Sequence, residues 1–267
     1  HSVEITQPFW MSTLEVTQKQ WLSLTGTGIQ AQFNKMFFNT DKTLLFGSTW
    51  VSFKDLFFLV VDDFDDPNEL ETFLRKYGAG ICSDKEPDRP MSCVSYEEAL
   101  QFCSLLTSIE RTAGRLPDGY VYSLPTEAQW EYACRAGTVT AYGGDVVAMG
   151  VFFRNDKGSG GKADENDYYP KTRFGNSTGK ANKWGLFDMH GNLAEWCLDW
   201  YGRYPSETAT YTASKDPVGP RLGEARVYRG GSFISSPAEC RSAYRSRAKP
   251  NARDISIGFR VVLVPRR

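Results

Sequence analysis

Apolar residues at spacings of three and four, each series opening on a capping residue, predict helices in this chain. The clearest series begins at Ser95, which Glu98 follows three residues later. In that pattern the two side chains satisfy amide groups that the first helical turn leaves unpaired. The apolar residues that follow would bury one face of the helix: Ala99, Phe102, Cys103 and Leu106.

Three more segments begin in the same way. Their capping residues are Thr17, Asp66 and Thr126, each with Gln or Glu at the third helical position. Gly78 and Gly137 are expected to end the second and third of these helices, because glycine readily takes the left-handed conformation of a helix terminus.

The remaining pattern predicts short strands and long loops. Apolar runs at 56–61, 226–230 and 258–264 have the length of strands. The stretch 137–183 is rich in Gly, Asn, Asp and Lys and shows no sustained period, which indicates irregular loops. Because no repeat and no linker divides the chain, we expect one loop-rich domain.

Composition excludes two classes of partner. The 267 residues have a net charge of −1, so there is no overall basic field to hold nucleic acid. The apolar run at 56–61 is the longest in the chain, and its six residues fall far short of the ~20 that a membrane helix needs. We therefore expect no nucleic acid partner and no insertion into a membrane.

The cysteines point to packing rather than to metal binding. Six cysteines lie far apart without a CxxC pair, and the chain has two histidines, His1 and His190. This arrangement excludes a zinc finger. We interpret the cysteines as mostly buried thiols, and one or two disulfides remain open if the protein is exported.

Seven motifs, in this order, resemble the formylglycine-generating enzyme family, also known as the sulfatase-modifying factors. They are MSTLEVTQKQW, PMSCVSYEEALQFC, SLPTEAQWEYACRAGT, NKWGLFDMHGNLAEWCLDWY, RVYRGGSF, CRSAYR and IGFRVV. The resemblance covers about 9–262 and is poorest at 30–90, which we interpret as an insertion in a single domain spanning 1–267.

The resemblance implies an α+β fold, the C-type lectin-like fold of this family. Two main helices, those opening at Ser95 and Thr126, would lie around a small antiparallel sheet with large loops. The motif NKWGLFDMHGN would form a turn in which Gly185 and Gly191 adopt positive φ.

The resemblance also allows the enzymatic activity to be assessed. The family's oxidase holds copper(I) with two cysteines after the RGGS motif, and here the second falls on Cys240 but the first on Ser235. Since cuprous ion selects thiolates, we expect no copper. Cys103 and Cys134 match disulfide positions of some members but lack partners, which leaves Cys197 and Cys240 as the pair with the best claim to a disulfide.

Other catalytic chemistry finds little support. The iron-dependent sulfoxide synthases of this fold need a His-rich partner domain, and Ser235 as a nucleophile would need a base. His190 lies in a structural turn motif, and the spacing of the acidic residues indicates no catalytic pair. We therefore expect no enzyme activity, with an oxidase that still uses Cys240 as the rival interpretation.

Within the family, the segment 228–256 most resembles the variable proteins of bacterial diversity-generating retroelements. It interleaves family scaffold residues with variable positions of paratope-like composition. We expect a protein ligand to bind through these positions, and Leu193, Ala194, Leu198 and Arg203 would extend the same face. The candidate binding residues are Tyr228, Phe233, Ile234, Ser235, Ser236, Glu239, Tyr244, Ser246, Ala248, Lys249, Asn251, Asp254, Ile255 and Ser256.

The resemblance suggests a structural calcium ion, with Glu195 as the candidate ligand and the cluster 164–167 as a weaker second site. One assured carboxylate is few for a cation that takes six or more oxygens, so we expect no required cofactor. We also expect a monomer, exported or at the cell surface, with any leader or lipid anchor upstream of this sequence. A structural role in an envelope complex is a third interpretation.

Overall fold

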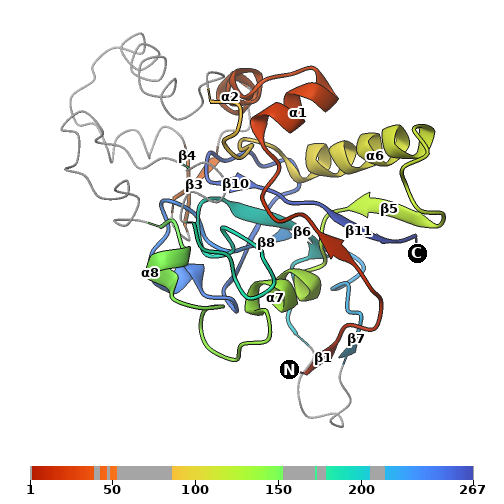
Figure 1. The fold of residues 1–267 in the computed structure, drawn as a ribbon. Coiled ribbons are helices and arrows are strands. Elements are labelled where there is room, and N and C mark those ends of the chain that lie inside the picture. Colours follow the sequence, from red (N-terminus) through yellow and green to blue (C-terminus); the bar gives the residue numbers. More distant parts are fainter. Residues whose placement is uncertain are drawn as a thin grey trace, which may run out of the picture.

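A four-stranded sheet in the order β10-β6-β8-β9 forms the centre of the structure (Figure 1). Strand β8 (Arg226–Arg229) runs antiparallel to both β6 (Ala194–Trp200) and β9 (Arg245–Ala248), and β10 (Ile257–Gly258) pairs with β6 in parallel. The computed structural model describes the residues 2–38, 43–46, 49–52, 86–152, 172, 179–204 and 214–266.

A second sheet joins the two ends of the chain. Its order is β2-β11-β5, with β2 (Trp10–Met11) and β5 (Tyr120–Ser123) antiparallel to the C-terminal strand β11 (Val262–Pro265). Two small pairs complete the described strands. β1 (Val3–Glu4) pairs with β7 (Ser214–Lys215), and β3 (Thr43–Phe46) pairs with β4 (Thr49–Ser52).

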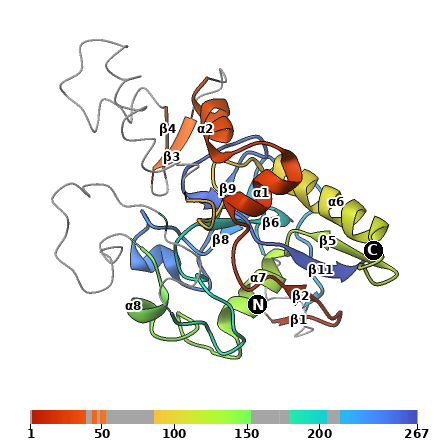
Figure 2. The same cartoon turned by 45° about the horizontal axis from the view of Figure 1, so that its top comes forward.

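Three of the predicted capping patterns do open helices. Thr17 caps α1 (Gln18–Thr25), Ser95 caps α6 (Tyr96–Thr112) and Thr126 caps α7 (Glu127–Arg135), each with the reciprocal hydrogen bonds of a capping box. Figures 1 and 2 show α6 beside the β11–β5 pair and α7 next to β6 and β8. The family's two structural helices are therefore α6 and α7, as predicted.

Several predictions need correction or lie outside the described residues. Ala136, not Gly137, takes the left-handed position that ends α7, and Gly137 follows with a positive φ. The Asp66 helix and the strand at 56–61 lie outside the described part of the chain. The structure adds helices that the capping patterns did not predict: α2 (Ile29–Phe38), α8 (Val146–Met149) and the 3₁₀ helix η2 (Pro237–Cys240).

The run at 226–230 forms β8 as predicted, but the run at 258–264 is not one strand. The chain leaves β10 after Gly258 and enters the other sheet at Val262. Between them, Phe259 and Arg260 are fully buried. The Phe259 ring meets Trp21 of α1 and Phe102 of α6, with centroids at 6.0 Å and 5.3 Å. This crossing therefore ties both sheets to the main hydrophobic core.

The crossing residue Arg260 forms a buried ion pair with Glu195 of β6. Arg260 donates from Nε and Nη2 to the two carboxylate oxygens of Glu195, at 2.6 Å in each case, and both side chains are fully buried. Trp130 donates its indole N–H to the same carboxylate at 2.7 Å. Nearby, Glu15 accepts hydrogen bonds from Asn192 and from the backbone of Leu193. Burial raises the pKa of Glu15 well above its usual value, and the charges of Asp188 and Glu195 raise it further.

The glycines predicted for the turn before β6 have positive φ, 80° at Gly185 and 113° at Gly191. They differ in their surroundings. A Cβ at Gly185 would meet open space, whereas one at Gly191 would lie 1.9 Å from the carbonyl oxygen of Val151. Gly191 is therefore required because another backbone passes against it. None of the described helices is both long and apolar enough to cross a lipid bilayer.

Replacing Glu195 with Gln should destabilise the fold strongly, because it leaves Arg260 buried without its counter-ion. We expect a loss of about 3–5 kcal/mol in the free energy of unfolding, measured by urea denaturation. The double variant Glu195→Gln/Arg260→Met should recover part of that loss. The control is Glu110→Gln, which removes the exposed ion pair with Arg115 and should change stability little. Equal losses in Glu195→Gln and Glu110→Gln would contradict the central role of the pair.

Candidate functional site

A small pocket, with about 20 Å³ open to the centre of a water molecule, lies where β8, η2 and β9 meet. Its walls come largely from the C-terminal segment. Seven of the residues that line it are predicted binding residues: Tyr228, Ile234, Ser235, Glu239, Tyr244, Ser246 and Ser256. The other four are Ala194, Arg229, Gly231 and Ser232.

Local hydrogen bonds shape the pocket wall. After β8, the Ser232 amide donates to Ser235 Oγ at 3.0 Å, and the Ser235 amide donates to the Ser232 carbonyl at 2.9 Å. η2 then begins, where the Ser236 amide and hydroxyl both donate to Glu239. The Tyr244 hydroxyl reaches the other oxygen of Glu239 at 3.4 Å. The polar groups of this turn therefore pair largely with one another, and Ser236 remains exposed to solvent.

The predicted binding residues divide by burial. Ser236, Lys249 and Asn251 are exposed, while Ile234, Ser235, Glu239, Tyr244, Ser246 and Ile255 are partly exposed. Tyr228 and Ser256 retain 6% exposure each and face the pocket. In register, Tyr228 lies directly opposite Ser246 on β9.

Three of the predicted binding residues are in the interior and cannot contact a ligand. Phe233 packs with Val151 and Leu193 in a small apolar cluster. Ala248 belongs to the main core because it points inward from β9. Asp254 is also buried, and its carboxylate accepts from the amide and the hydroxyl of Ser256. The prediction of surface exposure was wrong for these three and also for two buried residues that line the pocket, Ser256 and Tyr228, the latter a member of the main hydrophobic core.

The proposed extension of the face holds only in part. Leu193 is fully buried, and Leu198 packs against the main core. Ala194 is buried too but lines the pocket, and Arg203 is exposed. Since strand residues alternate between two faces, neighbours along β6 do not share one surface.

The side chains at the family's copper positions do not fit a cuprous site. Cys240 is fully buried, and burial raises the pKa of its thiol to about 12. Ser235 supplies a hydroxyl that the Ser232 amide already engages. One protonated thiol and one neutral hydroxyl are a poor donor set for an ion that selects thiolates. At these two positions the described residues therefore offer one thiol where the resemblance implies two.

The five described cysteines are unpaired and buried: Cys93, Cys103, Cys134, Cys197 and Cys240. This confirms the buried thiols predicted for Cys103 and Cys134. The Cys197–Cys240 disulfide, left open by the sequence, does not form. Burial raises the pKa of Cys134 to about 12, so that thiol is also not activated.

His190 has a structural role, as its motif predicted. The Gly143 amide donates to its Nε2 at 2.9 Å, and its Nδ1 lies 2.8 Å from the carbonyl oxygen of Cys240. The amide contact makes Nε2 an acceptor, so Nδ1 carries the proton. Burial lowers the pKa of His190, which favours this neutral form. With both nitrogens engaged, the ring does not serve as a base for Ser235.

The calcium prediction for Glu195 needs correction. Both of its carboxylate oxygens accept from Arg260, and one also accepts from Trp130. A cation would have to displace the buried guanidinium, so Glu195 is not available as a ligand. Among the described residues, no group of three or more His, Cys, Asp or Glu side chains could hold a metal ion. The cluster 164–167 lies outside them.

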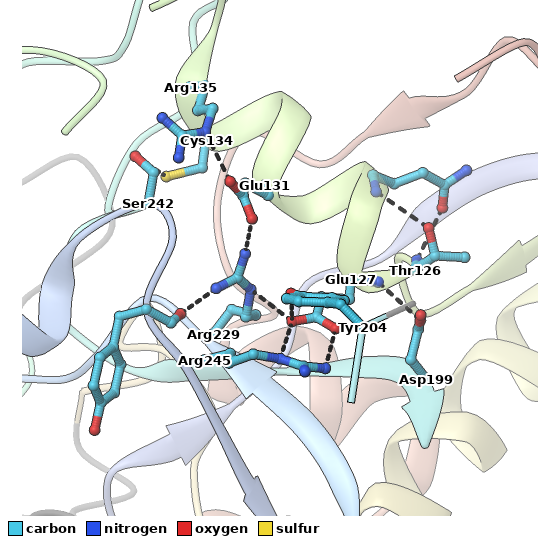
Figure 3. A network of polar contacts seen from close by, with 12 residues as sticks. Thr126, Glu127, Glu131, Cys134, Arg135, Asp199, Tyr204, Arg229, Ser242 and Arg245 are labelled. Carbon is cyan, nitrogen blue, oxygen red and sulfur yellow. Dashed lines mark hydrogen bonds and ion pairs between the residues drawn. The ribbon is translucent and has the colours of Figure 1, made fainter. Parts of the chain in front are cut away.

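Two arginines fasten the pocket strands to α7 (Figure 3). Arg245 of β9 donates to both oxygens of Glu127, at 2.7 Å and 2.5 Å. Arg229 of β8 is buried, lies 3.4 Å from Glu127 and also pairs with Glu131. Figure 3 shows Glu127 between the two guanidinium groups, with the Tyr204 hydroxyl beside it. Sequence reasoning counted these arginines as scaffold but could not assign their partners.

The far end of the segment is fastened in the same way. Arg253 pairs with Glu98 of α6 and donates to Gln32 of α2 at 2.8 Å. Arg260 then pairs with Glu195 of β6. Charged hydrogen bonds thus hold the segment on both sides of the pocket, and the pocket residues between them are left to other contacts.

A family model described as the sulfatase-modifying factor enzyme 1-like domain matches residues 1–264. The formylglycine-generating enzyme of Streptomyces coelicolor is 33% identical over 205 residues, which are 70% of this chain and 56% of that protein. The enzyme of Thermomonospora curvata is 29% identical over 206 residues, covering 70% of this chain and 60% of that protein. The chain thus spans about three fifths of the length of these curated relatives.

Solved structures show the same fold. Treponema denticola variable protein 1 superposes with a TM-score of 0.63 at 24% identity, covering 99% of this chain and 87% of that one. PvdO from Pseudomonas aeruginosa superposes with a TM-score of 0.59 at 21% identity, covering 98% and 82%. The fold class predicted from the motifs, an α+β C-type lectin-like fold, is confirmed. The chain belongs to the sulfatase-modifying factor family, whose members include the formylglycine-generating enzymes.

Proposed function

We propose that this protein is a non-catalytic ligand-binding domain that recognises a protein through the pocket and the exposed residues around it. The observation that carries the proposal is that half of the predicted binding residues line one pocket. Their mixture of tyrosine, serine, isoleucine and one carboxylate offers both apolar contact and adaptable hydrogen bonding. The likeness in fold to Treponema denticola variable protein 1 agrees with this interpretation.

The donor chemistry argues against an oxidase. The curated relatives are named formylglycine-generating enzymes, but copper chemistry of their kind needs two thiolates, and this chain offers one buried thiol at Cys240. His190 and Cys134 do not replace the missing ligand, because their polar atoms are engaged by the surrounding structure. The pocket beside Cys240 nevertheless offers polar side chains to a ligand, among them Ser235, Glu239 and Ser246.

We further propose that a retroelement diversifies this face and that the domain acts as a monomer, exported or at the cell surface. Positions that tolerate many side chains must not carry the fold. Ile234, Tyr244 and Ser246 satisfy this condition, since they are partly exposed and lie between anchored residues. The Ser235 hydroxyl accepts from the Ser232 amide and so helps to close the turn. Phe233, Ala248 and Asp254 do not, and we expect them to be held constant.

Copper titration separates the two functions. We expect the wild-type protein to take up no stoichiometric copper(I) in competition with a chromophoric chelator, because Cys240 alone cannot form a two-thiolate site. The variant Ser235→Cys restores the two-cysteine pattern and serves as the positive control. Tight one-to-one binding by the wild type, lost in Cys240→Ser, would refute the non-catalytic function.

Blocking the pocket should abolish ligand binding without unfolding the domain. A displayed library of random peptides of about twelve residues serves as the source of ligands. Peptides that bind the wild type should lose at least about tenfold in affinity for Ser246→Arg, whose long side chain would fill the pocket. Thermal unfolding checks that the variant remains folded. Binding that is unchanged in folded Ser246→Arg would place recognition elsewhere.

Comparison of gene copies within one genome tests diversification. We expect differences to concentrate at the solvent-facing pocket positions, including Ile234 and Tyr244, and to spare the buried Phe233 and Asp254. The changes should trace to adenines of a nearby template repeat. Differences scattered evenly along the chain would contradict the proposal.

A further inference from the structure

Positive charge is concentrated in the segment that forms the pocket. Between Arg226 and Arg253 the chain carries seven Lys or Arg residues and a single carboxylate, Glu239. The whole chain nevertheless has a net charge of −1. The rest of the protein is therefore acidic, and this segment stands out as its basic part.

Four of the seven cations are committed to the fold. Arg229, Arg245 and Arg253 pair with carboxylates of α7 and α6. Arg226 lies between two aromatic rings, 4.3 Å from the centroid of Tyr96 and 3.4 Å from that of Trp200, and donates to the Leu198 carbonyl. These four hold structure together and are not available to a partner.

The other three cations face solvent: Arg241, Arg247 and Lys249. None of them pairs with a carboxylate of the described residues. Arg241 donates from Nε to the Ala238 carbonyl at 2.8 Å, which fixes the side chain and leaves its charge unbalanced. The single carboxylate of the segment, Glu239, accepts from Ser236 and from Tyr244. The exposed side of this segment therefore carries an excess of positive charge, contributed by Arg241, Arg247 and Lys249.

Arg247 has the geometry of a prepared anion site. It lies on β9, the edge strand of the central sheet, and its guanidinium sits 4.4 Å from the centroid of the Tyr201 ring. The same ring lies 4.4 Å from the Arg245 guanidinium, which Glu127 holds in place. Stacking on an aromatic ring restrains a guanidinium and leaves the N–H groups at its edge able to donate.

This site follows the pocket residue Ser246 along β9 but lies on the other face of the strand. Ser246 pairs with Tyr228, which also lines the pocket, whereas Arg247 pairs with Val227. Because β9 is the edge strand of the sheet, a ligand segment that runs along its open edge can reach both faces. A guanidinium fork in such a position matches the two oxygens of a carboxylate.

We propose that the protein partner presents an acidic segment, with an Asp or Glu carboxylate bound by Arg247 at the edge of the central sheet and with Arg241 and Lys249 attracting further negative charge. This inference rests on the proposed function and specifies the chemistry of its ligand. Three exposed cations suit a few carboxylates of a protein, whereas a nucleic acid backbone usually needs many more phosphate contacts.

The test uses the full chain and the random peptide library already described. Peptides that bind the wild type should be enriched in Asp and Glu, and their affinity should fall at least about tenfold when the acidic residues are replaced with Asn and Gln. Arg247→Gln should weaken binding of the acidic peptides by a similar factor. Raising NaCl to about 0.5 M should weaken the wild type more than Arg247→Gln, because surface charges are screened.

Arg266→Gln is the matched control, since Arg266 is an exposed arginine that follows β11 in the other sheet. It should bind the acidic peptides like the wild type. Selected peptides without acidic residues, or equal affinity of wild type and Arg247→Gln, would overturn the inference. If such peptides still lose affinity for Ser246→Arg, the binding function stands and only the acidic partner fails.

Discussion

Four arginines fasten the C-terminal segment to the rest of the protein, and the pocket depends on them. Arg229 and Arg245 reach α7, Arg253 reaches α6 and Arg260 reaches β6. Each pair joins residues far apart in sequence, and all of the carboxylates lie on elements that form by local capping or central strand pairing. Because a buried charge without its partner is costly, these contacts restrict the segment to one path across the sheet.

Because these ion pairs fix the path of the C-terminal segment, the exposed residues between the arginines do not have to stabilise the fold. β9 is held to β8 by backbone hydrogen bonds, which are insensitive to the side chains that the strand carries. The turn at Ser232 and Ser235 closes largely on its own polar groups. A segment without helical or strand periodicity can therefore be well ordered, since its order comes from its ends.

The sequence predicted the parts of the structure that local chemistry determines. The boxes at Thr17, Ser95 and Thr126 opened helices because capping depends on residues three apart. The split between β10 and β11 was not visible, because Phe259 and Arg260 look like strand residues until their distant partners Trp21 and Glu195 are known. Likewise Phe233 and Ile234 are neighbours of similar character, and only the packing of Leu193 against Phe233 decides which one turns inward. Arg247 was missed as a binding residue because its aromatic support, Tyr201, comes from another strand's end.

Glu98 carries a further consequence. Its side chain accepts from the Ser95 amide to complete the start of α6, and it also binds Arg253 and Lys35. One carboxylate thus joins the onset of a core helix to the last part of the pocket segment. A replacement of Arg253 would be felt as fraying of α6 as well as loosening of the segment. The stability of a core helix and the position of the pocket segment are therefore coupled through a single carboxylate.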